Sequence, residues 1–334
     1  MLATNSNQTY VLTDEEKDTF LRDGFVGPFE PFLSESAIDE LHDYCEDLEV
    51  NKRKHPLYKR FSSRDCHLIS PKVLDMFTHP AVVQRLRQLM GDDLVLWRSK
   101  IFYKSPGEGR VGWHQEWGLF NGEEIGNDKP SLIFANQGDA WWNITMWIAL
   151  NDIPVENGPL QFVSGSHQTR YPYHMVPMTE SAFFHDPFVG VSDPKTIIER
   201  AQKSELVLDI DTKNLFDGVD PYRFSMAEMK AYVFDKLSHK MAKVTPFEPD
   251  PERLVTLPMK KGQFVIFTER TMHGSLPNTS DKNRVAINCR VTFTDTLIYP
   301  GRLEGDYIDG SNIDISAHRC VLLSGEDKNG QNVY

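Results

Sequence analysis

Five short runs of β-branched and aromatic residues constrain the fold of this chain more than any other feature of its sequence. Glycine, proline and asparagine punctuate the runs, which is typical of strands joined by turns. The runs are LVLWRSKIFYK from Leu94, NITMWIALNDI from Asn143, GPLQFV from Gly158, GQFVIFTE from Gly262 and RVAINCRVTFT from Arg284. So many strands within one domain predict a mostly β architecture, either a sandwich or a barrel-like jelly roll.

The part of the chain before these runs has the patterns of helices. Thr13 followed by Glu16 is a capping-box pattern, and Gly24 stands where such a helix would end. A second helix is expected from near Ser36, and a third is expected to end at Gly91. Each has apolar residues at helical spacing, namely Ile38, Leu41, Cys45 and Leu48 in the second and Val82, Leu86 and Leu89 in the third.

The stretch from about 171 to 253 interrupts the strand-rich sequence with polar and helical segments such as MAEMKAYVFDKL. A segment of that length between strands fits an insertion, or a lid over an active site. No linker between independent domains is evident. We therefore predict a single domain over residues 1–334, with core strands at about 94–170 and 254–300 and the insertion at about 171–253.

Composition and charge exclude several classes of protein. A formal net charge of −12 argues against nucleic acid as a partner, because a phosphate backbone needs a basic face. No run of 18 apolar residues is present, and the N-terminus lacks the pattern of a secretory signal, so we expect a cytoplasmic protein with no membrane span. The four cysteines lack C-x-x-C spacing, so neither a disulfide framework nor a structural zinc site is expected.

One basic cluster stands out against the acidic background. It runs from Asn51 to Arg60 and carries Lys52, Arg53, Lys54, Lys59 and Arg60. Most charge runs are solvated surface loops, and that is the first interpretation. Docking of an acidic partner is the second.

Three residues in two separate segments have the chemistry of a metal site. In the segment W-H-Q-E, His114 and Glu116 are two residues apart, so on a strand both side chains point to one face. His273 follows the apolar run GQFVIF. Two histidines and one carboxylate leave three coordination positions open, as in oxygen-activating non-haem iron(II) sites. His-x-Glu alone is a weak signal, since such a pair is more often a surface feature.

Two arginines follow the distal histidine. Arg284 comes eleven residues after His273, and Arg290 comes six residues later, so the two arginines share one face of a strand. An arginine inside a barrel is costly unless an anion meets it, and a guanidinium grips a carboxylate through two hydrogen bonds. A dicarboxylate co-substrate is such an anion. The alternative is that both arginines pair with acidic residues such as Asp295.

Taken together, these motifs resemble the phytanoyl-CoA dioxygenase superfamily. Within it, the chain is most similar to the iron halogenases and hydroxylases that act on amino acids in nonribosomal peptide pathways. The resemblance covers roughly residues 94–170 and 257 to the end. It is carried by W-R-x-x-x-F-x-K (Trp97 to Lys104), W-H-Q-E, T-M-W, N-G-P-L-Q-F-V-S-G-S-H, H-G-S with a downstream arginine, and C-V-L-L-S-G-E-D (Cys320 to Asp327).

The resemblance implies a cupin-like double-stranded β-helix with N-terminal helices, an Fe(II) ion, 2-oxoglutarate as co-substrate, and O2. His114 and His273 match the metal histidines, and Arg284 matches the arginine that anchors the far carboxylate of 2-oxoglutarate, with Trp147 nearby. The residues that match those around the metal's carboxylate or halide position are Asn121, Thr145 and Arg290. The alternatives are a plain core aromatic for Trp147, a strand residue chosen for propensity for Thr145, and part of an N-G turn for Asn121.

Within the family that the chain resembles, the residue at position 116 distinguishes halogenases from hydroxylases. The halogenases have a small residue there, which lets a halide occupy the vacated coordination site. Here the residue is glutamate, whose carboxylate fills that site, so hydroxylation is the expected outcome. The usual family residue is aspartate, and Glu116 departs from it by one methylene.

The predicted function is hydroxylation of an unactivated C–H bond of an amino acid in natural-product biosynthesis. The amino acid is either free or bound to a peptidyl carrier protein. Acidic residues in the insertion and near residues 122–124 favour a citrulline- or arginine-like side chain. Two alternatives remain: an oxygenase of acyl or lipid substrates, and a catalytically silent cupin-like binding module.

Overall fold

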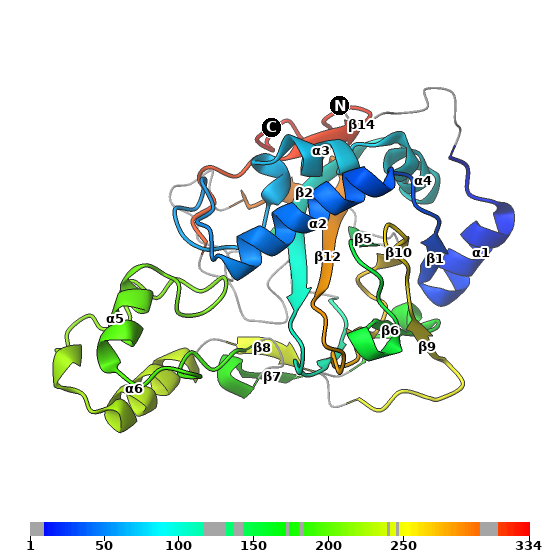
Figure 1. The fold of residues 1–334 in the computed structure, drawn as a ribbon. Coiled ribbons are helices and arrows are strands. Elements are labelled where there is room, and N and C mark those ends of the chain that lie inside the picture. The colour runs from blue at the N-terminus through cyan, green and yellow to red at the C-terminus, as the bar shows by residue number, and fades with distance from the viewer. Residues whose placement is uncertain are drawn as a thin grey trace.

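A computed structural model describes residues 10–116, 131–135, 143–171, 174–180, 184–238, 241–244, 247–300 and 313–334 (Figure 1). Within these residues, the largest sheet has six strands, all paired antiparallel to their neighbours. In spatial order they are β1 (Phe25–Phe29), β10 (Phe264–Thr268), β5 (Asn143–Ala149), β12 (Arg284–Phe293), β2 (Leu94–Lys104) and β14 (Val321–Ser324).

A second sheet of four antiparallel strands supplies the other half of the β structure among the described residues. Its order is β3 (Val111–His114), β11 (His273–Ser275), β6 (Leu160–Val163) and β9 (Leu254–Leu257). Two smaller pairs are β4 (Leu132–Ile133) with β13 (Leu297–Ile298), and β7 (His174–Pro177) with β8 (Met241–Val244). All five predicted runs form strands, and the mostly β prediction is confirmed.

Alternation along β12 explains how the six-stranded sheet is covered. Val285, Ile287 and Cys289 are buried in the same cluster as apolar side chains from the helices, so this face of the sheet packs under them. Ala286, on the opposite face, belongs with Trp147 and Phe162 to a second cluster between the two sheets. Helix α2 (Glu35–Val50) lies across β2 and β12 in Figure 1. Each large aliphatic side chain buried in this way contributes about 1.5–3 kcal/mol.

The N-terminal helices begin and end largely where the sequence predicts. In α1 (Asp14–Asp23), Thr13 Oγ1 accepts from the Glu16 amide at 3.1 Å, and Glu16 Oε2 accepts from the Thr13 amide at 2.7 Å, which completes a capping box. Gly24 ends the helix with a φ of 83°, a conformation that favours glycine. The remaining helices before the sheet are α2, which begins after its N-cap Ser34, α3 (Pro71–Phe77) and α4 (Pro80–Met90), which ends at Gly91.

The predicted insertion contains α5 (Pro194–Gln202) and α6 (Met226–Ser238), which pack around an apolar cluster of their own. In Figure 1 both helices lie to one side of the two sheets. That this segment acts as a lid, and that residues 1–334 form one domain, remain predictions. Among the described helices, none combines the length and the apolar character that a membrane span needs.

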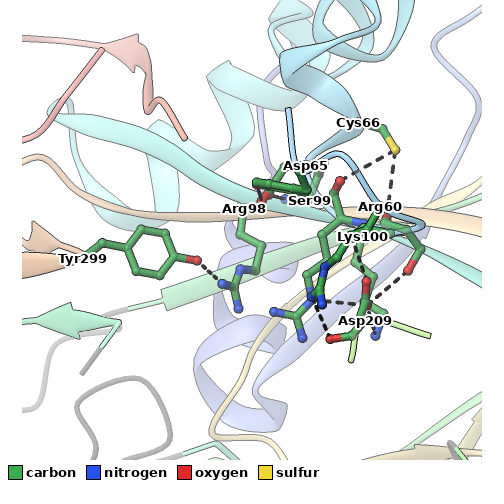
Figure 2. A network of polar contacts seen from close by, with 12 residues as sticks. Arg60, Asp65, Cys66, Arg98, Ser99, Lys100, Asp209 and Tyr299 are labelled. Atoms are coloured by element: carbon green, nitrogen blue, oxygen red, sulfur yellow. Dashed lines mark hydrogen bonds and ion pairs between the residues drawn. The ribbon is translucent and has the colours of Figure 1, made fainter. Parts of the chain in front are cut away.

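One buried carboxylate ties the insertion to the six-stranded sheet (Figure 2). Asp209 Oδ2 lies 3.3 Å from Arg64 Nε and 3.6 Å from Lys100 Nζ on β2. Ser62 Oγ donates to Asp209 Oδ1 at 2.7 Å, and Arg60 donates to the Asp209 backbone carbonyl at 3.1 Å. Burial alone would raise the pKa of Asp209, but the two cations and the hydroxyl lower it to about 2.

These contacts correct the interpretation of the basic cluster. Lys52, Arg53, Lys54 and Lys59 are exposed, as a solvated loop predicts. Arg60 is instead only 4% exposed, because it contacts the insertion of the same chain. The basic cluster is therefore a surface loop whose last residue has a structural role.

Candidate active site

Two histidines meet where the short strands β3 and β11 pair. His114 is the register partner of His273, and the centroids of the two imidazole rings are 4.2 Å apart. Nδ1 of His114 lies 2.8 Å from the Gly112 carbonyl oxygen, and Nδ1 of His273 lies 2.8 Å from the Thr271 carbonyl oxygen. A carbonyl only accepts, so each Nδ1 donates, and each Nε2 carries the lone pair that a metal ion requires.

The environment of His273 keeps its ring neutral. It is buried, and the rings of Phe162 and Phe267 lie 6.3 Å and 5.0 Å from it, centroid to centroid. Burial, followed by the proximity of His114, lowers the pKa of His273 to about 3. A neutral imidazole is the form that binds metal.

Glu116 lies beside these histidines but its carboxylate faces an arginine. Its amide donates to the Glu269 carbonyl oxygen at 2.8 Å, and its Oε2 is 3.4 Å from a terminal nitrogen of Arg290. Over the described residues, no three His, Cys, Asp or Glu side chains stand close enough together to hold a metal ion. The two histidines are therefore brought together, and the triad that adds Glu116 to them remains a prediction.

Glu269 is a site residue that the sequence analysis missed. It follows β10 directly and is 2% exposed. Its Oε1 is 3.0 Å from Arg290 Nε and accepts from Thr145 Oγ1 at 2.7 Å, while Oε2 accepts from Asn143 Nδ2 at 2.7 Å. Burial, and then the neighbouring Glu116, raise the pKa of Glu269, although Arg290 opposes that rise.

The alternation of β10 is the signal that could have found Glu269. Val265 and Phe267 pack between the sheets, so the next residue at period two points inward as well. Arg290 does pair with acidic residues, as one interpretation predicted, but the acids are Glu269 and Glu116 instead of Asp295. Thr145 is the register partner of Arg290 and contacts Glu269. Asn121 lies outside the described residues.

Arg284 stands opposite Lys104 in the pairing of β12 with β2. Arg284 donates to the Gly158 carbonyl oxygen at 2.7 Å, and its Cζ lies 5.8 Å from the centroid of the Trp147 ring. Lys104 donates to Ser275 Oγ at 3.0 Å, two residues along β11 from His273. Lys104 thus contacts the strand that carries His273, and Arg284 lies opposite Lys104 on β12.

The surroundings of this cation pair favour an anion. Burial lowers the pKa of Arg284 to about 10, and burial together with Arg284 lowers the pKa of Lys104 to about 7. Arg284 makes no ion pair with any described residue, and neither its Nε nor Trp147 Nε1 has a hydrogen-bond partner among them. Buried donors of this kind match a carboxylate ligand. Lys104 ends the motif W-R-x-x-x-F-x-K, but the sequence alone assigns it no role.

The sequence is similar to those of known dioxygenases and hydroxylases. Residues 20–286 match the family model described as Phytanoyl-CoA dioxygenase (PhyH). Ectoine dioxygenase from Nocardia farcinica (strain IFM 10152) is 28% identical over 169 residues, which are 47% of this chain and 52% of that protein. L-proline trans-4-hydroxylase from Streptomyces griseoviridis is 26% identical over 158 residues, 46% of this chain and 54% of that protein. The chain spans about half the length of the curated relatives it matches.

Solved structures extend the likeness over nearly the whole chain. A structure described as CytC3 with Fe(II) and alpha-ketoglutarate superposes with a TM-score of 0.61 at 21% identity, and covers 98% of this chain and 95% of that one. A structure described as the non-heme monooxygenase ThoJ, apo, superposes with a TM-score of 0.57 at 16% identity. It covers 95% of this chain and 86% of that one. These likenesses confirm the cupin-like double-stranded β-helix. Because the family model matches most of the chain and includes His114, Glu116, His273 and Arg284, the chain belongs to the phytanoyl-CoA dioxygenase family.

Proposed function

We propose that this protein is an Fe(II)- and 2-oxoglutarate-dependent hydroxylase that places one oxygen atom of O2 on an unactivated C–H bond of an amino acid. The observation that carries the proposal is the pair His114 and His273, register partners whose Nδ1 atoms both lie against backbone carbonyls. Such a pair fits iron in the chemistry of its donors, together with Glu116, and the buried cations Arg284 and Lys104 fit a dicarboxylate.

In the proposed site, His114 and His273 hold iron through Nε2, and Glu116 supplies the carboxylate. When bound, Fe(II) and 2-oxoglutarate supply the oxygen activation, with loss of CO2 and formation of succinate. The protein holds the ligands in place and keeps His273 neutral by burial. The phenyl rings of Phe162 and Phe267 exclude water from one side of that histidine.

Arg284 is the proposed anchor of the far carboxylate of 2-oxoglutarate, and Lys104 adds a second positive charge. All three hydrogens of the Lys104 ammonium already have acceptors, namely Ser275 Oγ and the carbonyl oxygens of Gly109 and Leu276. Lys104 therefore acts through its charge, whereas Arg284 Nε and Trp147 Nε1 have no acceptor among the described residues and can donate to a ligand.

Replacing Arg284 by glutamine is expected to raise the KM for 2-oxoglutarate about 100-fold, because it removes charge-assisted hydrogen bonds worth ~3 kcal/mol. Arg284→Lys keeps the charge but loses the planar fork, so a smaller rise is expected. Steady-state rates at increasing 2-oxoglutarate check both values. A KM unchanged in both variants would remove Arg284 from the co-substrate site.

Hydroxylation, rather than halogenation, is the proposed outcome because residue 116 is a glutamate. Charged side chains in the interior also support a polar substrate. The inner faces of β2 and β12 carry Lys104, Arg284 and Arg290, whereas an acyl chain would need a long apolar tunnel. Among the relatives, the one named for proline acts on an amino acid. We therefore propose a free or carrier-bound amino acid, with citrulline- and arginine-like side chains as the first to test, within natural-product biosynthesis.

The proposal is tested by anaerobic loading with Fe(II) and 2-oxoglutarate, followed by exposure to O2 with a panel of amino acids and their carrier-bound forms. Mass spectrometry then detects a product heavier by one oxygen atom, and succinate is measured in parallel. Product from an acyl-CoA in place of an amino acid would favour the lipid alternative. Binding of 2-oxoglutarate with no turnover on any substrate would favour a silent binding module.

A further inference from the structure

We propose that Asn288 is a further binding residue for 2-oxoglutarate, and that its side-chain amide donates a hydrogen bond to the far carboxylate, the one assigned to Arg284. This inference rests on the proposed function. Asn288 belongs to β12 and lies between Arg284 and Arg290, on the same face of the strand as both. The sequence alone assigns it no role.

The side-chain amide of Asn288 is buried without a partner for its oxygen. The residue is 2% exposed, and its Oδ1 has no hydrogen-bond partner among the described residues. Folding removes such an amide from water, and buried polar groups of folded proteins are nearly always paired. A ligand that binds between the two sheets can supply the missing partner.

The register of the six-stranded sheet places Asn288 between the histidines and Arg284. The ring of Phe267 contacts that of His273, with centroids 5.0 Å apart. The register partner of Phe267 on β5 comes two residues before Trp147, and Trp147 is the register partner of Asn288. Asn288 is therefore one inward-facing position further from the histidines than Phe267, and Arg284 is two such positions beyond Asn288. A ligand that joins the histidines to Arg284 passes Asn288.

Two other donors lie close to the same place. The Cζ atom of Arg284 is 5.8 Å from the centroid of the Trp147 ring, and Trp147 stands opposite Asn288 where β5 pairs with β12. Residues directly opposite each other in an antiparallel pair have Cβ atoms about 5 Å apart. Neither Arg284 Nε nor Trp147 Nε1 has a partner among the described residues. Guanidinium, indole and amide thus form one group of buried donors.

The acceptor capacity of a carboxylate explains the use of a third donor. Its two oxygens offer about four lone-pair directions. Lys104 has no hydrogen left to donate, and Arg284 already donates once to the Gly158 carbonyl oxygen. The Asn288 amide has two N–H hydrogens, and a half-turn of the amide exchanges Nδ2 with the unpaired Oδ1. It therefore adds a donor for the far carboxylate without adding a further buried charge.

The test is Asn288→Leu, which keeps the size of the side chain and removes its hydrogen-bonding groups. Binding of 2-oxoglutarate is measured anaerobically, by calorimetry of the Fe(II)-loaded protein and by the rise in Tm that the ligand causes. The Kd for 2-oxoglutarate is expected to become roughly 10-fold weaker or more, because a hydrogen bond to a charged group is lost. Without ligand, the Tm of the variant is expected to equal or exceed that of wild type, because an unpaired buried amide has been removed.

Two further variants make the result specific. Asn288→Asp replaces the donor by a negative charge next to a dicarboxylate, and it is expected to weaken binding more than leucine does. Cys289→Ala changes the next residue, which packs under the helices on the opposite face of β12, and it is expected to leave the Kd for 2-oxoglutarate unchanged.

Two results would overturn the role of Asn288. The first is a wild-type Kd for 2-oxoglutarate in Asn288→Leu or, should that variant fail to fold, in Asn288→Ala. The second is a change confined to the KM for the amino acid, which would assign Asn288 to the substrate. Wild-type protein that binds no 2-oxoglutarate in the presence of Fe(II) would overturn the proposed function instead.

Discussion

Hydroxylation is expected to fall at least about 1,000-fold when Glu116 is replaced by alanine, which corresponds to ~4 kcal/mol in the activation barrier. The substitution removes the one carboxylate of the proposed iron site and leaves only His114 and His273. It also takes away one acidic partner of Arg290, so less negative charge remains beside a divalent cation. Mass detection of the hydroxylated amino acid at saturating Fe(II) and 2-oxoglutarate measures the loss.

Two companion variants make this result specific. Glu116→Asp restores the residue usual in the family and is expected to keep measurable activity, whereas Glu116→Gln keeps the size without the charge and is expected to behave like alanine. Unchanged activity in Glu116→Ala would show that another acid binds iron. Glu269, which shares Arg290 with Glu116, would then be the residue to test.

The strands and the histidine pair could be predicted because they follow from local patterns. Turn residues and β-branched runs mark the core strands, and the two-residue spacing of His114 and Glu116 gives them one face of a strand. The pairing of His114 with His273 needs more than periodicity, because it joins strands far apart in the chain. The family motifs supplied that link.

The partners of the buried charges could not be predicted in the same way. Arg290 meets Glu269 because β10 and β12 both flank β5, and their register is set by packing across the whole sheet. Lys104 faces Arg284 for the same reason. A sequence pattern states which face a side chain shares, but not which residue of another strand lies opposite, and each of these contacts depends on that register.

Arg60 illustrates the same limit for a loop. A run of basic residues is normally solvated, and the sequence contains no sign that its last member is buried. The contact with Asp209 spans 149 positions and depends on how the insertion folds back on the sheet. Only the folded chain brings those two segments together.

Asp209→Asn is expected to lower the free energy of unfolding by about 3–5 kcal/mol at pH 7, the usual cost of removing one partner from a buried ion pair. Asparagine fills the same space but leaves Arg64 and Lys100 without their carboxylate. Asp217→Asn, an exposed position in the same insertion, is the matched control and should change stability by less than about 0.5 kcal/mol. Denaturant unfolding of the three proteins measures the differences.

The pH dependence of that difference tests its electrostatic origin. The folded pKa of Asp209, about 2, lies below the ordinary 3.8, so its carboxylate stabilises the fold above pH 4 and loses that contribution as pH falls from about 4 to 2. The gap between wild type and Asp209→Asn should therefore be constant from pH 7 to 5 and shrink below pH 4. If the difference in the free energy of unfolding persisted at low pH, it would come from packing and not from the charge of Asp209. Fe(II) affinity at pH 7 should not change, because the described contacts of Asp209 involve residues 60, 62, 63, 64 and 100 and none of the proposed ligands.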